Sequence, residues 1–242
     1  PSHAPRQAEE PPLAPLLRLC PVFADWPAAR LQELAASARM RHYRRRAQLP
    51  GRGSRQQDIL VIVSGAVDVE TTSVEGGKYT LAVLGPGQIT RLVYALGDVP
   101  LLFTVHARED ARLIHIPGAA LRRVLDAEPI LWRSVAQFAL QRFHLSVESH
   151  RDWALGSVRR RMARVLINLA HRYGSRNSRA SAGGTELRIT QADLASMLGV
   201  SRQTVSAELG RLKAAGVLES GAGYRIVTLR DVPALLRIAD EP

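Results

Sequence analysis

The chain has 242 residues and a formal net charge of +11 at pH 7, from 33 Lys and Arg against 22 Asp and Glu. This length can hold one large domain or two of ordinary size, and the positive charge favours a polyanionic partner. No apolar run approaches the ~18 residues of a membrane span, and the polar, proline-rich start is not a signal peptide, so we expect a cytoplasmic protein without a membrane partner. Cys20 is alone, which excludes a disulfide framework and a cysteine-ligated metal centre.

The first half of the chain is predicted to form a barrel or jelly roll. Residues 1–15 are expected to be a disordered arm, and residues 23–40 a short helical region with Asp25 as a possible cap. Short strands punctuated by Gly and Pro then follow, which argues against βαβ units. The predicted strands are Ile59–Val63, Ala66–Glu70, Tyr79–Leu84, Phe103–Ala107 and Arg112–Ile116. The expected jelly-roll domain spans residues 16–127.

Helices are predicted in the middle of the chain, first over 119–125 and then over a long stretch from Pro129 to Leu155. Apolar residues of the long helix approximate a seam, although Arg142 and Ser149 interrupt it. The seam residues are Leu131, Val135, Phe138, Leu145 and Trp153. We therefore expect residues 128–155 to pack both on the barrel and on a symmetric partner in a homodimer. A hinge at Gly156-Ser157, a helix over 159–173 and a flexible loop over 174–184 complete this region.

Residues 189–220 have the pattern of a helix-turn-helix. Thr190 can cap the first helix, and Asp193 stands three residues later, where the acid of a capping box belongs. Gly199 allows the tight bend, and Ser201 can cap the second helix. In that helix Val205, Leu209 and Leu212 recur at i, i+4 and i+7 and form one buried face.

The opposite face of the second helix is predicted to contact DNA bases. It carries Arg202, Gln203, Ser206 and Ala207 near the helix N-terminus, where a recognition helix meets base edges. An ordinary helical hairpin with a solvated polar face is the alternative. Two short strands after the hairpin, Val217–Glu219 and Tyr224–Leu229, add a wing and favour a winged helix-turn-helix domain over residues 156–242. The predicted fold class is thus α+β.

The order of barrel, long helix, hinge and winged helix-turn-helix resembles the Crp–Fnr family of bacterial transcription regulators. The run Asp58–Val67 is similar to the family's strand–turn–strand, and Gly85-Pro86-Gly87 to its glycine turn. Residues 199–206, GVSRQTVS, resemble the recognition-helix motif of the cyclic-AMP-responsive members. The resemblance implies a homodimer that binds palindromic promoter sites in double-stranded DNA and has RNA polymerase as a further partner.

The resemblance also implies roles for the residues of the recognition helix. Arg202 matches the family arginine, whose geometry suits guanine O6 and N7. Gln203 replaces the usual Glu, and Ala207 stands where the cyclic-AMP-responsive members place a second arginine, so we expect an altered half-site. The side chains expected to position the helix on phosphates are Ser201, Thr204, Ser206, Arg211 and Lys213. The run Arg159-Arg160-Arg161 is a further candidate for phosphate contacts.

The effector pocket departs from the family pattern. Cyclic-nucleotide binders carry a Gly-Glu pair after the glycine turn and an Arg-Ser pair on the next strand, whereas this chain has Arg91-Leu92 and Leu101-Leu102. An apolar pocket cannot hold an unpaired phosphate, so we do not expect a response to cyclic AMP. An apolar effector in a pocket of Arg91, Leu92, Leu101, Leu102 and Leu145, or no effector at all, is the expected alternative.

Other functions have weaker support in the sequence. Haem, as in a gas-sensing member of the family, would need axial ligands, for which His42, His106, His115 and His144 are conceivable. No motif of a hydrolase, a nucleotide-binding enzyme or a zinc protease is present, so no catalytic residue is expected. A non-specific charge-driven nucleic-acid binder and a signalling protein whose helix-turn-helix contacts protein remain open. An arginine run around Arg44–Arg46 is a solvated loop face or a contact to flanking DNA or RNA polymerase.

Overall fold

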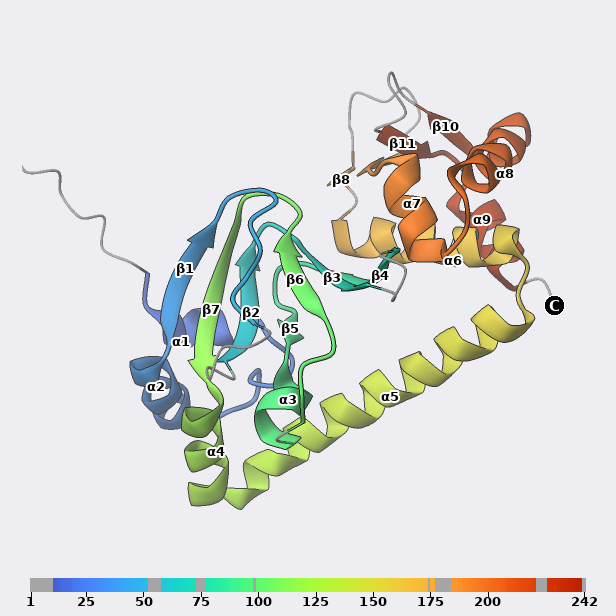
Figure 1. Cartoon of the computed structure of the whole chain (residues 1–242). Helices are drawn as coiled ribbons and strands as arrows, with labels where there is room; N and C mark the ends of the chain where they lie inside the picture. The colour runs from blue at the N-terminus through green and yellow to red at the C-terminus, as the bar shows by residue number, and fades with distance from the viewer. Residues whose placement is uncertain are drawn as a thin grey trace, which may run out of the picture.

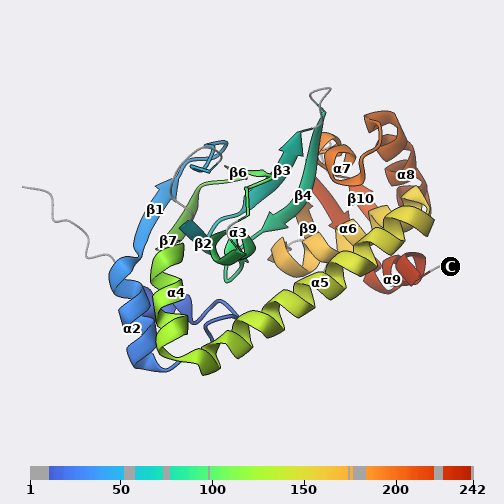
Figure 2. The same ribbon diagram turned by 60° about the horizontal axis from the view of Figure 1, so that its bottom comes forward.

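The structure is a computed structural model, and it describes residues 11–51, 58–72, 77–97, 99–173, 175–176, 184–220 and 226–240. A β-sandwich domain and a winged-helix domain lie side by side, joined by one long helix that runs beneath both (Figures 1 and 2). The α+β class and this order of parts are those predicted from the sequence. No helix within the described ranges is long and apolar enough to cross a membrane.

Two antiparallel sheets form the N-terminal domain. The first has the order β1-β7-β2-β5 and the second the order β4-β3-β6. The strands of the first sheet are β1 (Arg39–Tyr43), β2 (Asp58–Ser64), β5 (Ile89–Thr90) and β7 (Ala111–Pro117). Those of the second are β3 (Val67–Thr72), β4 (Lys78–Leu84) and β6 (Thr104–Ala107). β1 is absent from the sequence prediction because Arg39–Tyr43, RMRHY, has little of the apolar alternation typical of a strand.

Strand β2 is buried on both faces, and its side chains divide between two cores. Leu60 and Ile62 point to the second sheet, whereas Ile59 and Val61 point to the helices on the outer face. This division follows the period of two in a β-strand. The double burial explains why the segment has a continuous apolar run, as strands covered on both faces do.

Helices cover the outer face of the first sheet. They are α1 (Leu13–Leu17), α2 (Ala28–Ser37), α3 (Leu92–Gly97) and α4 (Gly118–Ala127). Two expectations fail here. Leu13–Leu17 is helical and Leu17 is fully buried, so the arm cannot extend to residue 15. Of the expected arm, residues 1–10 lie outside the described chain. Asp25 makes no cap, since α2 begins after Pro27 without a side-chain cap.

The long helix begins with a 3-10 turn (Pro129–Leu131) and continues as α5 (Trp132–Leu155). The seam predicted from the sequence lies on its inner face, because Leu131 and Val135 are buried in the β-sandwich core with Phe138 packed beside them. Those residues therefore cannot meet a symmetric partner. The opposite face of α5 is exposed.

The C-terminal domain is a winged helix with a larger sheet than the sequence suggested. Its helices are α6 (Val158–Tyr173), α7 (Gln191–Leu198), α8 (Arg202–Ala214) and α9 (Val232–Asp240). Its sheet has the order β10-β11-β9-β8, formed by β10 (Leu218–Ser220), β11 (Ile226–Leu229), β9 (Thr185–Arg188) and β8 (Ser175–Arg176). Part of the predicted loop 174–184 is thus strand, while residues 177–183 lie outside the described chain. The break between α5 and α6 falls at residues 156–157, where the hinge was expected.

Candidate nucleic-acid interface and effector site

The first helix of the helix-turn-helix begins with the predicted capping box. The Thr190 hydroxyl accepts a hydrogen bond from the Asp193 backbone N–H at 3.1 Å, and Asp193 Oδ2 accepts one from the Thr190 N–H at 2.9 Å. Gly199 ends the helix with φ of 59°, the left-handed conformation that glycine adopts without steric cost. Cap and turn therefore fix the angle at which the second helix leaves the first.

Helix α8 presents one apolar and one polar face. Val205 and Leu212 are fully buried and Leu209 nearly so. Arg202 and Gln203 are exposed at the first turn, and Ser206 and Ala207 are exposed one turn later. The side chains predicted to contact bases thus lie together on the free surface of the domain, and α8 lies on the side away from the β-sandwich (Figure 1).

The hydroxyls of Ser201 and Thr204 at the start of α8 take part in helix capping and also face the surface of the domain. Ser201 Oγ accepts a hydrogen bond from the Thr204 N–H at 3.1 Å, and the Ser201 and Thr204 hydroxyl oxygens lie 2.9 Å apart. One hydroxyl proton is used in that mutual bond. The other remains available to a phosphate oxygen beside the positive end of the helix.

The two cationic side chains at the end of α8, Arg211 and Lys213, differ in how firmly the protein holds them. Glu208, which is buried, accepts a hydrogen bond from Arg211 Nη1, so the guanidinium is held against the helix while two-thirds of the Arg211 side chain stays exposed. Lys213 is exposed in the last turn. Both can reach a phosphate, Arg211 as an oriented fork and Lys213 as a mobile charge.

The arginine run at the start of α6 has a structural role. Arg160 is buried and donates from Nε to the Ala239 carbonyl oxygen at 3.2 Å. Arg161 Cζ lies 4.4 Å from the centre of the Trp153 ring, and its Nη1 donates to the Leu198 carbonyl oxygen at 3.4 Å. The expectation of phosphate contacts at these two residues is wrong, because both side chains point into the protein.

The winged-helix domain is docked on its own β-sandwich through α7. Ser196 Oγ lies 3.1 Å from the Lys78 carbonyl oxygen and 3.1 Å from Thr80 Oγ1, both on β4. Arg108, beyond β6, contacts Asp193 at 3.1 Å and Asp68 at 2.8 Å. These polar contacts join the helix-turn-helix directly to the edge of the second sheet.

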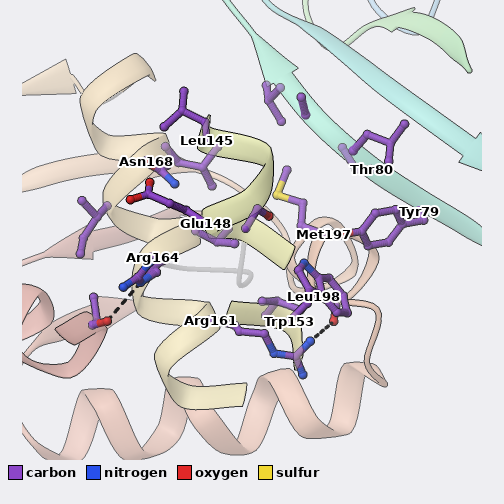
Figure 3. Close-up of a pocket in the computed structure, with 18 of the residues that line it drawn as sticks. Tyr79, Thr80, Leu145, Glu148, Trp153, Arg161, Arg164, Asn168, Met197 and Leu198 are labelled. Carbon is purple, nitrogen blue, oxygen red and sulfur yellow. Dashed lines mark hydrogen bonds between the residues drawn. The ribbon is translucent and has the colours of Figure 1, made fainter. Parts of the chain in front are cut away.

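Trp153, near the end of α5, fills the corner between the two domains. Its ring lies edge-on to Tyr79 of β4 with centroids 5.5 Å apart, and a Cβ placed on Gly199 would come within 2.9 Å of it. A cavity of about 510 Å³ opens beside this corner between β4, α5, α6 and α7, with Arg161, Arg164 and Asn168 on one wall (Figure 3). Leu145 lines the same cavity.

The five residues proposed for an effector pocket are not gathered in one place. Arg91 and Leu101 both come close to Gly51, since a Cβ there would lie 3.0 Å from Arg91 Nη2 and 3.2 Å from Leu101 Cδ2. Leu92 is part of the apolar core under the helices, Leu102 is 68% exposed, and Leu145 lines the interdomain cavity instead. Only Arg91 and Leu101 remain as neighbours.

A buried hydrogen-bonded chain lies near Arg91, and sequence reasoning missed its connection. His115 Nδ1 lies 3.2 Å from Asp58 Oδ2, and its Nε2 lies 2.9 Å from the Tyr43 hydroxyl. Burial lowers the pKa of His115 although the Asp58 carboxylate opposes the shift. The ring is therefore neutral at pH 7, with Nδ1–H donating to Asp58 and Nε2 accepting from Tyr43.

The candidate haem ligands lie in four different places. His42 is on β1, His115 has both nitrogens engaged, His106 of β6 lies 3.2 Å from Glu70, and His144 of α5 pairs with Glu148 at 3.4 Å. Within the described ranges no group of three His, Cys, Asp or Glu side chains is placed to hold a metal ion. Burial also raises the pKa of the Cys20 thiol to about 11, which keeps it protonated.

Comparison with known protein families identifies both domains. A model of the cyclic nucleotide-binding domain matches residues 40–128, and one of the Crp-like helix-turn-helix domain matches residues 160–238. The two matches stand in the order expected of one regulator family. The chain belongs to the Crp–Fnr family.

Relatives of this Crp–Fnr protein span most of its length. The nitrogen fixation regulation protein FixK of Azorhizobium caulinodans is 26% identical over 90% of this chain and 86% of its own. The cyclic AMP receptor protein of Thermus thermophilus is 27% identical over 77% of this chain and 82% of its own. The solved structure of FixK2 from Bradyrhizobium japonicum has a TM-score of 0.71 at 20% identity, covering 85% of this chain and 98% of that one, and confirms the fold.

Membership of the Crp–Fnr family gives the helix-turn-helix its role. The chain combines a cyclic nucleotide-binding domain with a Crp-like helix-turn-helix domain, which is a DNA-binding module. It is therefore a transcription regulator of the Crp–Fnr type.

Proposed function

We propose that this protein is a transcription regulator that binds palindromic promoter sites in double-stranded DNA sequence-specifically as a homodimer. The observation that carries the proposal is the exposed N-terminal face of α8, where Arg202, Gln203 and Ser206 lie free beside the cap of Ser201. Arg202 has the fork geometry for guanine O6 and N7, and Gln203 the amide geometry for adenine N6 and N7. Ser201, Thr204, Arg211 and Lys213 hold the helix on phosphates.

The exposed face of α5 supports the homodimer. Its residues recur with alternating spacings of four and three, which is the a/d pattern of a coiled coil. They are Ala136, Leu140, Phe143, Val147, His150 and Ala154. Leu140 and Phe143 are each 68% exposed and Val147 is 51% exposed, an apolar stripe that a single chain leaves in water. A dimer packed along this stripe would carry two α8 helices, and binding to successive major grooves requires those helices to lie about 34 Å apart.

The β-sandwich supports a regulator that does not respond to cyclic AMP. The family places a glycine where Arg91 stands, and Arg91 keeps the left-handed backbone that glycine would adopt, with φ of 68°. Leu92, at the position of the acid for the ribose, lies in the apolar core, and Leu101 and Leu102 offer no charge to a phosphate. RNA polymerase remains the proposed protein partner, for which the exposed Arg44–Arg46 offers a basic surface.

The test is binding to DNA of defined sequence. A site selected from a randomised pool and its scrambled version are titrated with the purified protein at several salt concentrations, with fluorescence anisotropy as the readout. We expect the selected site to be a palindrome bound at least a thousandfold more tightly than the scrambled DNA at physiological salt. Equal affinities with a steep salt dependence would show a charge-driven binder, and no binding would favour a signalling protein.

A further inference from the structure

Within the described residues, the Arg91 guanidinium is buried but lacks hydrogen-bond partners that a buried arginine normally has. It is 6% exposed, and its Nε and Nη2 atoms are buried without a hydrogen-bond partner in the described part of the chain. Buried guanidinium groups are normally paired, because a desolvated charge without a partner is costly. Burial lowers the pKa of Arg91, but a guanidinium remains charged at pH 7.

The two atoms without partners are not an arbitrary pair. Nε–H and the adjacent Nη2–H lie parallel along one edge of the planar guanidinium, and this edge binds the two oxygens of a carboxylate or phosphate bidentately. The backbone next to the edge is Gly51, where a Cβ would approach Nη2 to 3.0 Å. A side chain at position 51 would therefore crowd this edge, and glycine leaves it open.

The polar neighbours of Arg91 do not satisfy that edge. Burial lowers the pKa of Arg91, and the Asp58 carboxylate opposes this shift through space, whereas burial raises the pKa of Tyr43 and keeps its phenol uncharged at pH 7. The Asp58 carboxylate is engaged by His115 Nδ1 at 3.2 Å, and the Tyr43 hydroxyl by His115 Nε2 at 2.9 Å. Asp58 and Tyr43 are thus both hydrogen-bonded to the histidine, Asp58 as an acceptor and Tyr43 as a donor, and neither is a hydrogen-bond partner of Nε or Nη2. Of these two atoms, Nη2 lies beside Gly51, which Leu101 also approaches.

The backbone of Arg91 adds an independent observation. Its φ of 68° lies in the left-handed region, which is disfavoured for a residue with a long side chain. Residues held in such conformations cluster at ligand sites, where the surrounding structure maintains them. Here the conformation directs an arginine into the β-sandwich at the turn between β5 and α3.

We propose that Arg91 binds a small oxyanion, a carboxylate or a phosphate, through its Nε–Nη2 edge inside the β-sandwich. The site differs from a cyclic-nucleotide site because the cation comes from the turn after β5, while the residues before β6 are Leu101 and Leu102. The apolar Leu101 beside the fork favours a short organic acid over a strongly hydrated inorganic ion. The proposal is independent of DNA binding, and its test measures anion binding directly.

The experiment uses the full chain and titrates it with acetate, succinate, methyl phosphate and inorganic phosphate at constant ionic strength set with chloride. Isothermal titration calorimetry gives the affinity, and thermal unfolding gives a second readout because a ligand of the native state raises Tm. We expect saturable binding of at least one probe, with the carboxylate and phosphate arms identifying the preferred group.

Three variants decide whether Arg91 is the site. Arg91→Met removes the charge, and Arg91→Lys keeps it but removes the fork, so both are expected to weaken the anion at least tenfold. Arg123→Met, which removes an exposed charge from the same domain, should leave binding unchanged. If Arg91→Met does not fold, Arg91→Lys still decides. The absence of saturable binding to the wild type, or equal affinity in the Arg91 variants, would overturn the proposal.

Discussion

Asp193 of α7 and Arg108 of the β-sandwich lie 3.1 Å apart, so the acid that completes the cap of the helix-turn-helix also ties it to the other domain. The same Oδ2 oxygen accepts hydrogen bonds from the Thr190 backbone N–H and from the Thr190 hydroxyl. The start of the DNA-binding motif is thus coupled to the edge of the second sheet. A displacement of β4 or of Arg108 would act on the helix whose end sets the direction of α8.

Asp193→Asn tests this coupling. The amide oxygen can still accept from the Thr190 N–H, but the negative charge facing Arg108 is lost, while the Arg108–Asp68 pair stays within the β-sandwich. A partly exposed ion pair contributes up to about 1 kcal/mol, so we expect the docked arrangement to weaken by up to about fivefold. The measurement is the rate of limited proteolysis at residues 155–157, the link between α5 and α6.

The matched control is Asp231→Asn. Asp231 Oδ1 caps α9 by accepting from the Ala234 N–H at 2.8 Å, in the same domain. It should cost a similar amount of helix stability without changing cleavage at the link. If both variants accelerate cleavage equally, the effect comes from the domain's stability and the contact with Arg108 does not couple the domains.

Gln203→Glu tests the base preference of α8. A glutamine amide suits adenine N6 and N7, whereas a carboxylate only accepts and suits cytosine N4. We expect the preferred base at one position of each half-site to change, with a discrimination of about 1–3 kcal/mol. Selection from a randomised DNA pool measures this, and Arg202 should keep its guanine in both proteins. An identical selected site for the wild type and the variant would show that Gln203 does not contact a base.

Phe143→Glu tests the dimer face of α5. Phe143 is 68% exposed in the single chain and stands at the centre of the apolar stripe. In a symmetric dimer the substitution enters twice, and losing two buried side chains should weaken association on the order of a hundredfold or more. Light scattering across a concentration series measures the monomer–dimer equilibrium.

Gln141→Glu is the control for the dimer face. It adds the same charge to the same helix at an exposed position outside the stripe, and its effect on association should be small. If the Phe143 variant remained dimeric, the dimer interface would lie on another surface of the protein. Because a palindrome needs two reading helices, the monomeric variant should also lose affinity for the selected site but keep half-site preference.

The sequence predicted the winged helix well because local chemistry determines most of it. Thr190, Asp193, Gly199 and Ser201 each act within their own turn, and the structure confirms all four roles. The errors of the sequence prediction arise where packing between distant parts of the chain determines the direction of a side chain. Arg160 and Arg161 have the composition of a phosphate-binding run, but packing against α9 and Trp153 turns them inward.

The apolar seam of α5 shows the same limit of prediction from sequence. A helix with apolar residues on two faces has two possible stripes, and only the β-sandwich shows that the face with Leu131 and Val135 is already covered. The pocket is a third case. Leu101 and Leu102 are adjacent in sequence, yet one lies beside Arg91 and the other is 68% exposed, a difference that adjacency in the sequence does not reveal.

His115 predicts how stability depends on pH. Burial lowers its pKa from the ordinary value of 6.5, so the native state resists the proton that the unfolded chain accepts. Stability from this site is therefore complete above about pH 6.5 and is lost as pH falls toward the lower native pKa, with a slope of up to about 1.4 kcal/mol per pH unit. Urea unfolding between pH 5 and pH 8 measures the slope.

His115→Gln should flatten that dependence, since the amide does not titrate, although losing the bonds to Asp58 and Tyr43 should lower stability at pH 8. His144→Gln is the control, because its imidazole is mostly exposed on α5 and makes only a 3.4 Å contact with Glu148. The wild type and the His144 variant should give parallel pH profiles. Loss of slope in the His144 variant, or its persistence in the His115 variant, would assign the titration to another group.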